Sequence, residues 1–389
     1  MDLISVKYTR HCGQVNEWSL SDFKPQQINL VVGKNASGKT RTLNVIASLA
    51  HLLCADYRGL FEDSLFDFSF KNSEGSIYRY LLEQSSSEVL REELYLDDEI
   101  VLKRKQENAE LYFAELNQKL QIAVPSKIIV AVSRRDPLQH PFFEELYHWG
   151  SRTLHYRFGT VFGRNRGLVL LPSQGRESGA EEYEIDLRKT DNVVELFLQG
   201  KNKYGEKFVE LIIQDMKEIS YEITAITVEY AMDLSLSATP SSHPAVLAIQ
   251  EADLNCLTYQ HKMSQGMFRA LSLIIQLNLS KLDSEPGCII IDDIGEGLDY
   301  ERSSHLIRLL VKKVQATKIQ LIMSSNDRFV MNNVELNHWS IIERKGHDSR
   351  IYNNQNAKEI FEEFEFTGLC NFDLLSSAYF SDKEELEEK

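Results

Sequence analysis

The sequence of 389 residues has few cysteines and lacks a long hydrophobic run. The cysteines are Cys12, Cys54, Cys256, Cys288 and Cys370. They are odd in number, lie far apart and form no C-x-x-C pair, which argues against a disulfide scaffold and a zinc ribbon. No apolar segment approaches the ~18 residues that a membrane span needs, and the first seven residues lack the basic start and apolar core of a secretory signal. We therefore expect a cytoplasmic protein that does not enter a membrane.

Basic residues are in the minority, with 43 Lys and Arg against 58 Asp and Glu and a formal net charge of −15. This balance argues against a surface made mainly to neutralise nucleic-acid phosphates, although a local basic groove stays compatible with it. The histidines His51, His140, His148 and His155 show no metal-binding spacing. With 43% hydrophobic and 26% charged residues, the composition is that of a globular protein. The length fits two or three lobes, or one large α/β domain with an insertion.

The hydrophobic pattern predicts an α/β fold. The run 28–32 stops at Gly33, as a buried parallel strand would, and leads into an amphipathic helix over about Lys39–Cys54. Apolar and polar residues alternate from Phe66 to about Gln106, which predicts antiparallel strands. Further strands are predicted at 128–132, 221–230, 246–249, 288–291 and 319–323. Further helices are predicted around Val194–Ile212, at 266–282 and at about 303–313.

A glycine-rich loop lies between the first strand and helix. Gly33-Lys34-Asn35-Ala36-Ser37-Gly38-Lys39-Thr40 matches G-x-x-x-x-G-K-[ST] in the strand-to-helix context that this motif requires. The glycines let successive backbone N–H groups turn towards the phosphates of a nucleotide, and the helix N-terminus adds partial positive charge. We expect Lys39 to reach the β- and γ-phosphates and the Thr40 hydroxyl to bind Mg²⁺. The motif therefore predicts binding of ATP with Mg²⁺.

Two carboxylates follow the predicted strand 288–291. Asp292 is the expected Mg²⁺ partner, since a site of this kind needs an acid at the end of a second strand. Asp293 is expected to orient or deprotonate the attacking water. A surface turn is the alternative interpretation of the pair.

Two further segments resemble motifs of ABC-type ATPases. Gly295-Glu296-Gly297-Leu298-Asp299 resembles the D-loop, and Met263-Ser264-Gln265-Gly266-Met267 resembles a variant of the L-S-G-G-Q signature. The resemblance implies a head-to-tail homodimer, in which Ser264 and Gly266 of one subunit contact the γ-phosphate bound by the other. A helix cap formed by Ser264 is the alternative. The predicted nucleotide-binding residues are Gly33, Asn35, Ala36, Ser37, Gly38, Lys39, Thr40, Arg41, Ser264, Gly266 and Asp299.

Within this class the chain resembles the branch without membrane domains, the chromosome-maintenance, RecF and overcoming-lysogenization-defect ATPases. The stretch between Thr40 and Ser264 contains no sustained heptads and is too short for long coiled-coil arms. We expect a P-loop NTPase of the ABC-ATPase type. Its predicted parts are an N-terminal lobe over 1–132, a compact and mostly helical insertion or lid over 133–220, and a C-terminal lobe over 221–389.

The chain departs from this family at two positions. Asn326 stands where the family usually has a switch histidine, and it can donate a hydrogen bond but cannot titrate. Asp293 replaces the usual glutamate, as in RecF-like proteins, and both departures imply slow hydrolysis. Gln139 is the candidate for the glutamine that senses Mg²⁺ in this family. The predicted catalytic residues are Lys39, Asp293 and Asn326, and the predicted metal ligands are Thr40, Asp292 and Gln139.

The sequence shows no second set of catalytic residues outside the ATPase motifs, so we expect another protein to carry out the downstream reaction. By analogy with stand-alone relatives, we expect an ATPase that controls a separately encoded effector in bacterial antiviral defence. One alternative is a RecF-like repair ATPase that grips DNA, and another is an ATP-dependent scaffold with negligible hydrolysis. Arg134, Arg135, Arg164 and Arg166 would form the DNA groove, or else are solvated charges.

The C-terminal segment combines aromatic and acidic residues. Phe361, Phe364, Phe366 and Phe372 are expected to pack a helix onto the core. The charged end at 381–389 is expected to fray.

Overall fold

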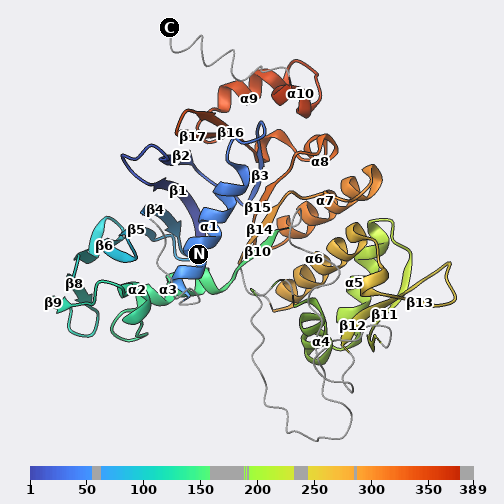
Figure 1. Cartoon of the computed structure of the whole chain (residues 1–389), viewed down its shortest axis with the longest axis horizontal. Helices are drawn as coiled ribbons and strands as arrows, with labels where there is room; N and C mark the ends of the chain where they lie inside the picture. The colour runs from blue at the N-terminus through green and yellow to red at the C-terminus, as the bar shows by residue number, and fades with distance from the viewer. Residues whose placement is uncertain are drawn as a thin grey trace, which may run out of the picture. The chain divides into compact units, whose positions relative to one another are not determined.

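The computed structural model describes residues 1–54, 63–157, 188, 190, 192–231, 244–283 and 287–376. The chain divides into two compact units, each built from segments that are far apart in the sequence (Figure 1). The first unit comprises Met1–Thr153, Pro286–Ile291 and Lys318–Lys389, and the second comprises Leu154–Glu285 and Asp292–Thr317. None of the described helices is long and apolar enough to cross a membrane.

A large sheet organises the first unit. Its strands are β1 (Asp2–Arg10), β2 (Trp18–Phe23), β3 (Ile28–Val32), β4 (Ser64–Lys71), β5 (Ile77–Ser85), β6 (Glu88–Leu96), β7 (Glu99–Lys105), β8 (Asn108–Phe113), β9 (Gln118–Ala123), β14 (Cys288–Asp292), β15 (Gln320–Ser324), β16 (Trp339–Lys345) and β17 (Asp348–Asn353). From β14 onwards the strand order is β14-β15-β3-β16-β17-β2-β1-β4-β5-β6-β7-β8-β9. The strands β14, β15, β3 and β16 pair in parallel, and the strands from β4 to β9 pair antiparallel.

The parallel strands carry the apolar runs that stand out in the sequence. Every residue of β3, β14 and β15 is buried, as expected for strands covered on both faces. The glycine-rich segment 33–38 separates β3 from the helix α1 (Lys39–Leu53), whose buried residues include Leu43, Ile46 and Leu49. These elements confirm the predicted strands at 28–32, 288–291 and 319–323 and the predicted helix after Gly33.

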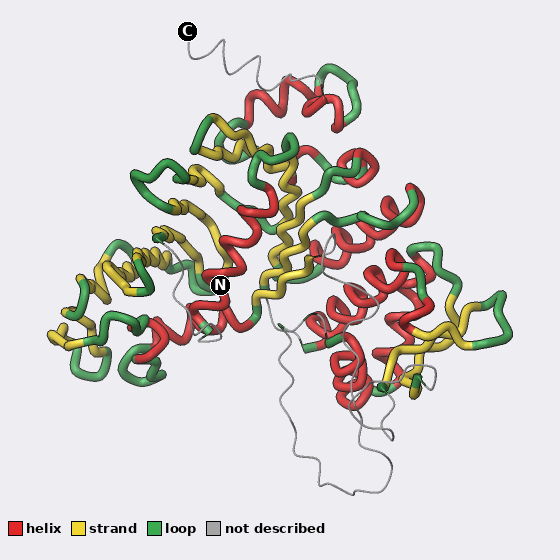
Figure 2. Tube along the Cα trace, viewed as in Figure 1, coloured by secondary structure: helices red, strands yellow, loops and turns green. Residues whose placement is uncertain are grey.

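The antiparallel strands alternate between buried and partly exposed residues, as the sequence predicted between Phe66 and Gln106. In β4 the buried side chains include Phe66, Phe68 and Phe70. The helix α3 (Pro141–Ser151) packs here, because the ring of Trp149 meets that of Phe70 edge-on at 4.7 Å between centroids. Figure 2 shows that strands dominate this part of the chain.

The predicted strand at 128–132 is wrong. Ile128 is 39% exposed, and the short helix α2 spans Val130–Ser133. The buried carboxylate of Glu92 accepts hydrogen bonds from the backbone N–H groups of Val130 (2.8 Å) and Ala131 (2.9 Å). Its partner Arg104 is equally buried. A distant acid thus occupies the backbone donors that a strand would have used, and no local pattern reveals it.

Short helices flank β16 and β17 in the C-terminal part of the first unit. They are α8 (Arg328–Asn332), the 3-10 helix η2 (Leu336–His338), α9 (Lys358–Glu365) and α10 (Asn371–Ser376). Phe361 and Phe364 are buried, which confirms that α9 packs onto the core, whereas Phe366 is 92% exposed and does not. The predicted frayed end at 381–389 lies outside the described residues.

The second unit combines helices with a small antiparallel sheet. Its elements are β10 (Thr153–Arg157, which begins at the last residue of the first unit), α4 (Val193–Tyr204), α5 (Glu206–Glu218), β11 (Ile223–Tyr230), β12 (Ala245–Glu251), β13 (Leu257–Tyr259), η1 (Gln260–Lys262), α6 (Gln265–Leu282) and α7 (Tyr300–Gln315). The small sheet has the order β11-β12-β13. The predicted strands at 221–230 and 246–249 and the predicted helices at 266–282 and 303–313 are confirmed.

The single helix predicted around Val194–Ile212 is two helices. Gly205 separates α4 from α5 with a φ of 63°, a backbone conformation that glycine adopts without steric cost. Between Leu198 and Phe208 Tyr204 is the only large apolar residue, and Gly205 is a helix-ending signal that the prediction of a single helix overlooked.

Candidate functional site

The glycine-rich loop connects β3 to α1, as predicted. A Cβ atom added to Gly33 would lie 2.5 Å from the carbonyl oxygen of Ile342, so no larger residue fits there. Gly38, the N-cap of α1, has a φ of 115°, and no side chain caps this helix end. Ala36 is also in the left-handed region, with a φ of 62°. The loop therefore wraps tightly in front of an uncapped helix N-terminus, a backbone arrangement that binds anions.

Two polar side chains of the loop suit a phosphate. The buried ammonium of Lys39 donates to the carbonyl oxygens of Gly33 (2.8 Å) and Lys34 (3.2 Å). The hydroxyl of Ser37 is buried without a hydrogen-bond partner among the described residues. An unpartnered buried donor beside a held ammonium is costly unless a ligand accepts its hydrogen bond. These residues therefore fit the phosphates of a nucleotide.

Ser349, more than 300 positions away in the sequence, holds the loop and is itself held by Trp18. The hydroxyl of Ser349 donates to the carbonyl oxygen of Ser37 at 3.1 Å. The indole N–H of Trp18 donates to the Ser349 hydroxyl at 2.9 Å. Sequence reasoning missed both residues, because neither belongs to a motif and only the sheet brings them to the loop.

Positive charge gathers beside the loop. Arg41 follows Thr40 in the first turn of α1, and its guanidinium lies over the ring of Trp18, 4.9 Å from the centroid. Burial, and then the like charges of Arg344 and Arg10, lower the pKa of Arg41. Arg10 and Arg344 therefore lie close enough to act on Arg41 next to the glycine-rich loop, a repulsion that an anionic ligand would relieve.

Polar residues lie at the ends of β15, which pairs with β3, and of β14, the next strand along the sheet. Asp292 is the last residue of β14 and is buried, and Asn326 follows β15 and is exposed. Because β14, β15 and β3 pair in parallel, their carboxyl ends share one edge of the sheet, where β3 leads into the glycine-rich loop. This edge is where α/β sheets bind ligands. The helix α8 that follows is capped by Asp327 and not by Asn326.

Asp293 occupies the first position after β14. It has a φ of 55°, in the left-handed region, and is half-buried. A residue other than glycine in this conformation is uncommon, although Asp tolerates it better than most. The turn redirects the chain into the predicted D-loop.

Gln139 lies between α2 and α3. Its carbonyl oxygen accepts from the backbone N–H of Ala114, in the turn between β8 and β9. The following helix α3 packs on the C-terminal end of α1, where a Cβ on Gly150 would meet the carbonyl oxygen of Ala50 at 2.7 Å. The glycine-rich loop precedes the opposite end of α1. A role for Gln139 in sensing Mg²⁺ stays a prediction.

The arginine cluster of the sequence analysis is only partly described. Arg135 pairs with Glu144 (2.9 Å) and lies over the ring of Tyr147, which makes it a structural residue. Arg134 is exposed, and Arg164 and Arg166 lie outside the described residues.

In the second unit, the predicted signature begins α6. The Ser264 hydroxyl caps the helix and accepts from the backbone N–H of Met267 at 3.2 Å. A Cβ on Gly266 would lie 2.3 Å from the carbonyl oxygen of Gly297, in the predicted D-loop. The two motifs are therefore in backbone contact, and only glycine fits at position 266.

The D-loop is held from α6 and begins α7. The buried guanidinium of Arg269 donates to the carbonyl oxygen of Glu296 at 3.0 Å, and burial lowers the pKa of Arg269. Asp299 caps α7 by accepting from the backbone N–H of Arg302 at 3.0 Å. Hydrogen bonds to Arg302 lower the pKa of Asp299. Sequence reasoning identified Asp299 but missed Arg269, which follows the signature on the same helix.

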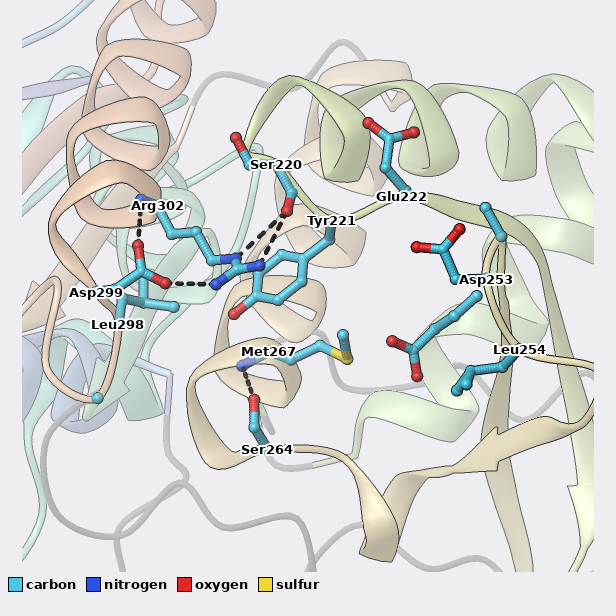
Figure 3. A pocket seen from close by; sticks show the side chains of 13 residues that line it. Ser220, Tyr221, Glu222, Asp253, Leu254, Ser264, Met267, Leu298, Asp299 and Arg302 are labelled. Carbon is cyan, nitrogen blue, oxygen red and sulfur yellow. Dashed lines mark hydrogen bonds and ion pairs between the residues drawn. The ribbon is translucent and has the colours of Figure 1, made fainter.

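A pocket of about 490 Å³ opens between these two helix ends (Figure 3). Ser264 and Met267 line it from α6, and Asp299 and Arg302 line it from α7. Tyr221 adds an aromatic wall. Besides Asp299, the acidic residues that line the pocket are Glu222, Glu251 and Asp253. The pocket therefore carries more negative than positive charge, in contrast to the glycine-rich loop.

No protein-family model matches the chain, and no curated protein is significantly similar to it in sequence. Among solved structures, the chain is similar to an SMC head bound to the C-terminal winged-helix domain of ScpA, with a TM-score of 0.50 and 11% identity over 90% of this chain and 97% of that one. The head domain of Thermotoga maritima SMC gives a TM-score of 0.45 at 12% identity, over 91% of this chain and 99% of that one. The Pyrococcus furiosus head with an extended coiled coil, bound to the C-terminal domain of ScpA, gives 0.47 at 11%, over 94% and 99%. The first of these likenesses, which spans nearly all of both chains, assigns to this chain the fold of an SMC head domain.

Proposed function

We propose that the chain is an Mg²⁺-dependent ATPase that binds nucleotide at the glycine-rich loop. The observation that carries the proposal is the buried pair of Lys39 and Ser37 at an uncapped helix N-terminus. Lys39 would exchange its carbonyl partners for phosphate oxygens, and Ser37 would donate its unused hydrogen bond. Thr40 and Asp292 would hold Mg²⁺, which would neutralise charge on the β- and γ-phosphates.

Hydrolysis is proposed to be slow. Asp293 would orient the attacking water as a carboxylate, and Asn326 would donate a hydrogen bond towards the γ-phosphate without changing its own charge. The position of Asn326 after β15, beside the strand that leads into the glycine-rich loop, supports this role.

The active form is proposed to be a head-to-tail homodimer. Ser264 and Gly266 begin a helix whose N-terminus can face the γ-phosphate bound by the partner chain, and the backbone contact of Gly266 with Gly297 fixes the two motifs together. The two chains would then complete each other's sites.

Mixing two inactive variants tests this arrangement. We expect Lys39→Ala to abolish ATP binding, because it removes the ammonium that faces the phosphates. Ser264→Arg should retain ATP binding and lose hydrolysis, because its bulk blocks closure. A heterodimer of the two then contains one intact composite site, and steady-state phosphate release should return. Absence of activity in heterodimers whose formation is verified by native mass spectrometry would contradict the shared site, and hydrolysis by folded Lys39→Ala would contradict the nucleotide site itself.

We propose that this chain controls a separately encoded effector protein in a bacterial antiviral defence module, and that the effector carries out the downstream reaction. The described residues hold no group of three or more His, Cys, Asp or Glu side chains placed to bind a metal ion, as a metal-dependent nuclease would need. The structurally similar SMC head is bound to a domain of another protein, which supports partner binding.

Purification of the natively expressed chain with and without Mg-ATP tests the partner. We expect the product of a neighbouring gene to co-purify in one nucleotide state. DNA cleavage by the homogeneous chain, or no co-purifying protein in either state, would overturn the proposal. Salt-dependent DNA binding would instead favour a repair-type ATPase.

A further inference from the structure

Arg302, in the first turn of α7, connects three parts of the second unit through one side chain (Figure 3). Its guanidinium forms an ion pair with Asp299 of the D-loop. The Nε and Nη2 atoms both donate to the carbonyl oxygen of Ser220, at 3.3 and 3.2 Å. The guanidinium plane lies over the ring of Tyr221, 4.4 Å from its centroid. This set of contacts needs a planar group with several donors, which lysine does not provide.

The segment that Arg302 grips is a strained turn. Ser220, between α5 and β11, has a φ of 63°, in the left-handed region that residues other than glycine seldom adopt. Its hydroxyl lies 3.1 Å from a carboxylate oxygen of Glu301 and 3.1 Å from the Nδ1 atom of His305, both on α7. The surrounding contacts therefore keep the turn in a conformation that it would not hold alone.

The gripped turn continues to the signature. Tyr221 is nearly buried, and it lines the pocket together with Ser264 and Met267 at the start of α6. Burial raises the pKa of the Tyr221 phenol, and hydrogen bonding with Ser264 acts in the opposite direction. The ring thus stands between the guanidinium of Arg302 and the serine that caps the signature helix.

We propose that Arg302 is a positioning residue for hydrolysis, which holds the D-loop and the Ser220–Tyr221 turn in one arrangement and thereby fixes Ser264 for the nucleotide of the partner chain. This inference rests on the proposed head-to-tail site. Arg302 touches no residue of the glycine-rich loop in the proposed scheme, so its loss should spare nucleotide binding by its own chain. It should lower the turnover of nucleotide bound by the partner.

The test compares Arg302→Gln and Arg302→Lys with Arg308→Gln, an exposed arginine on the same helix. We expect Arg302→Gln to lower kcat by roughly 10- to 100-fold, since small misplacements remote from the reacting atoms cost this much. The Kd for ATP, measured by titration of a fluorescent ATP analogue, should stay within about twofold, a change well below 1.4 kcal/mol. Arg302→Lys should be almost as impaired, because one ammonium cannot replace the fork and the stacked plane. Arg308→Gln should behave as wild type.

Mixing again assigns the defect to a chain. A heterodimer of Arg302→Gln and Lys39→Ala pairs an intact glycine-rich loop with an intact signature, so its phosphate release should return to the level of the Lys39→Ala and Ser264→Arg mixture. No recovery, alongside recovery of that reference mixture, would overturn the role of Arg302 and leave the shared site standing. Failure of both mixtures would overturn the head-to-tail site and this proposal with it.

A second variant covers the case in which Arg302→Gln does not fold. Tyr221→Leu removes the aromatic face and leaves the Arg302 bonds to Asp299 and Ser220 in place. We expect a smaller loss of kcat with an unchanged Kd for ATP. Wild-type turnover by Tyr221→Leu, or an equal weakening of ATP binding and turnover, would contradict the proposal.

Discussion

The glycine-rich loop and the signature region are held in place by different groups. In the loop, the ammonium of Lys39 bonds to carbonyl oxygens of its own segment, and a glycine at position 33 lets another strand pass close by. In the signature region, arginine side chains bind carbonyl oxygens of neighbouring segments, Arg269 that of Glu296 and Arg302 that of Ser220. In the proposed function the lysine would exchange its carbonyl partners for phosphate oxygens, whereas the arginines hold helix ends and turns through carbonyl oxygens. The glycine-rich loop is therefore suited to bind phosphate, and the signature region is suited to hold the N-terminus of α6 in a fixed position.

The charges of the two regions differ in the same sense. The like charges of Arg344 and Arg10 act on Arg41 beside the glycine-rich loop. The pocket beside Ser264 instead carries several carboxylates, and its Arg302 is already paired with Asp299. Affinity for phosphate should therefore come from the first region, while the second contributes a helix N-terminus and a hydroxyl. Changes in the second region should alter closure and turnover more than binding.

Gly266→Val should show the largest difference between the roles of the two regions. The added Cβ atom would lie 2.3 Å from the carbonyl oxygen of Gly297, and this backbone oxygen cannot move cheaply. Overpacking of this kind costs about 1–3 kcal/mol and displaces the D-loop. We expect ATP-dependent dimerisation and hydrolysis to be lost while ATP binding survives. Analytical ultracentrifugation with and without Mg-ATP measures dimerisation, phosphate release measures hydrolysis, and nucleotide titration measures ATP binding.

A control at the other end of the same helix separates packing from helix propensity. Ser280→Val places the same side chain in α6 at a half-buried position remote from the D-loop. It should leave dimerisation intact. If Gly266→Val dimerises normally with ATP, the signature and D-loop do not act as one body. If it loses ATP binding as well, the two regions are not independent.

The two regions also differ in how much the sequence reveals of them. The glycine-rich loop, β3 and α1 follow from local pattern, because a short apolar run, glycines and an amphipathic period are contiguous. Ser264 and Asp299 could be named as helix starts for the same reason. Their contacts could not, since Arg269 and Arg302 look like ordinary helical arginines until the fold brings carbonyl oxygens to them.

The same limit explains the errors in the first unit. A carboxylate on β6, Glu92, converts the apolar run at 128–132 from a strand into the start of α2. The role of Gln139 stays a prediction, because a residue type at an approximate position carries no information on its neighbours. Ser349 and Trp18, which support the loop from distant strands, carry no sequence signal at all.

The smallest expected effect comes from weakening the hydrogen bonds through which Trp18 and Ser349 support the glycine-rich loop. Trp18→Phe keeps most of the buried ring but removes the N–H that donates to the Ser349 hydroxyl, so Ser349 is less well oriented to hold the carbonyl oxygen of Ser37. The lost bond should cost about 1 kcal/mol of unfolding free energy, measured by urea denaturation. It should also weaken ATP binding a few-fold, because the loop is held less firmly.

The matched control is Trp339→Phe. Trp339 is a buried tryptophan of the first unit whose N–H donates to the carbonyl oxygen of Val334 at 3.1 Å. It should lose similar stability and keep wild-type affinity for ATP. Equal affinities in the two variants would show that the distant strands stabilise the fold without shaping the glycine-rich loop.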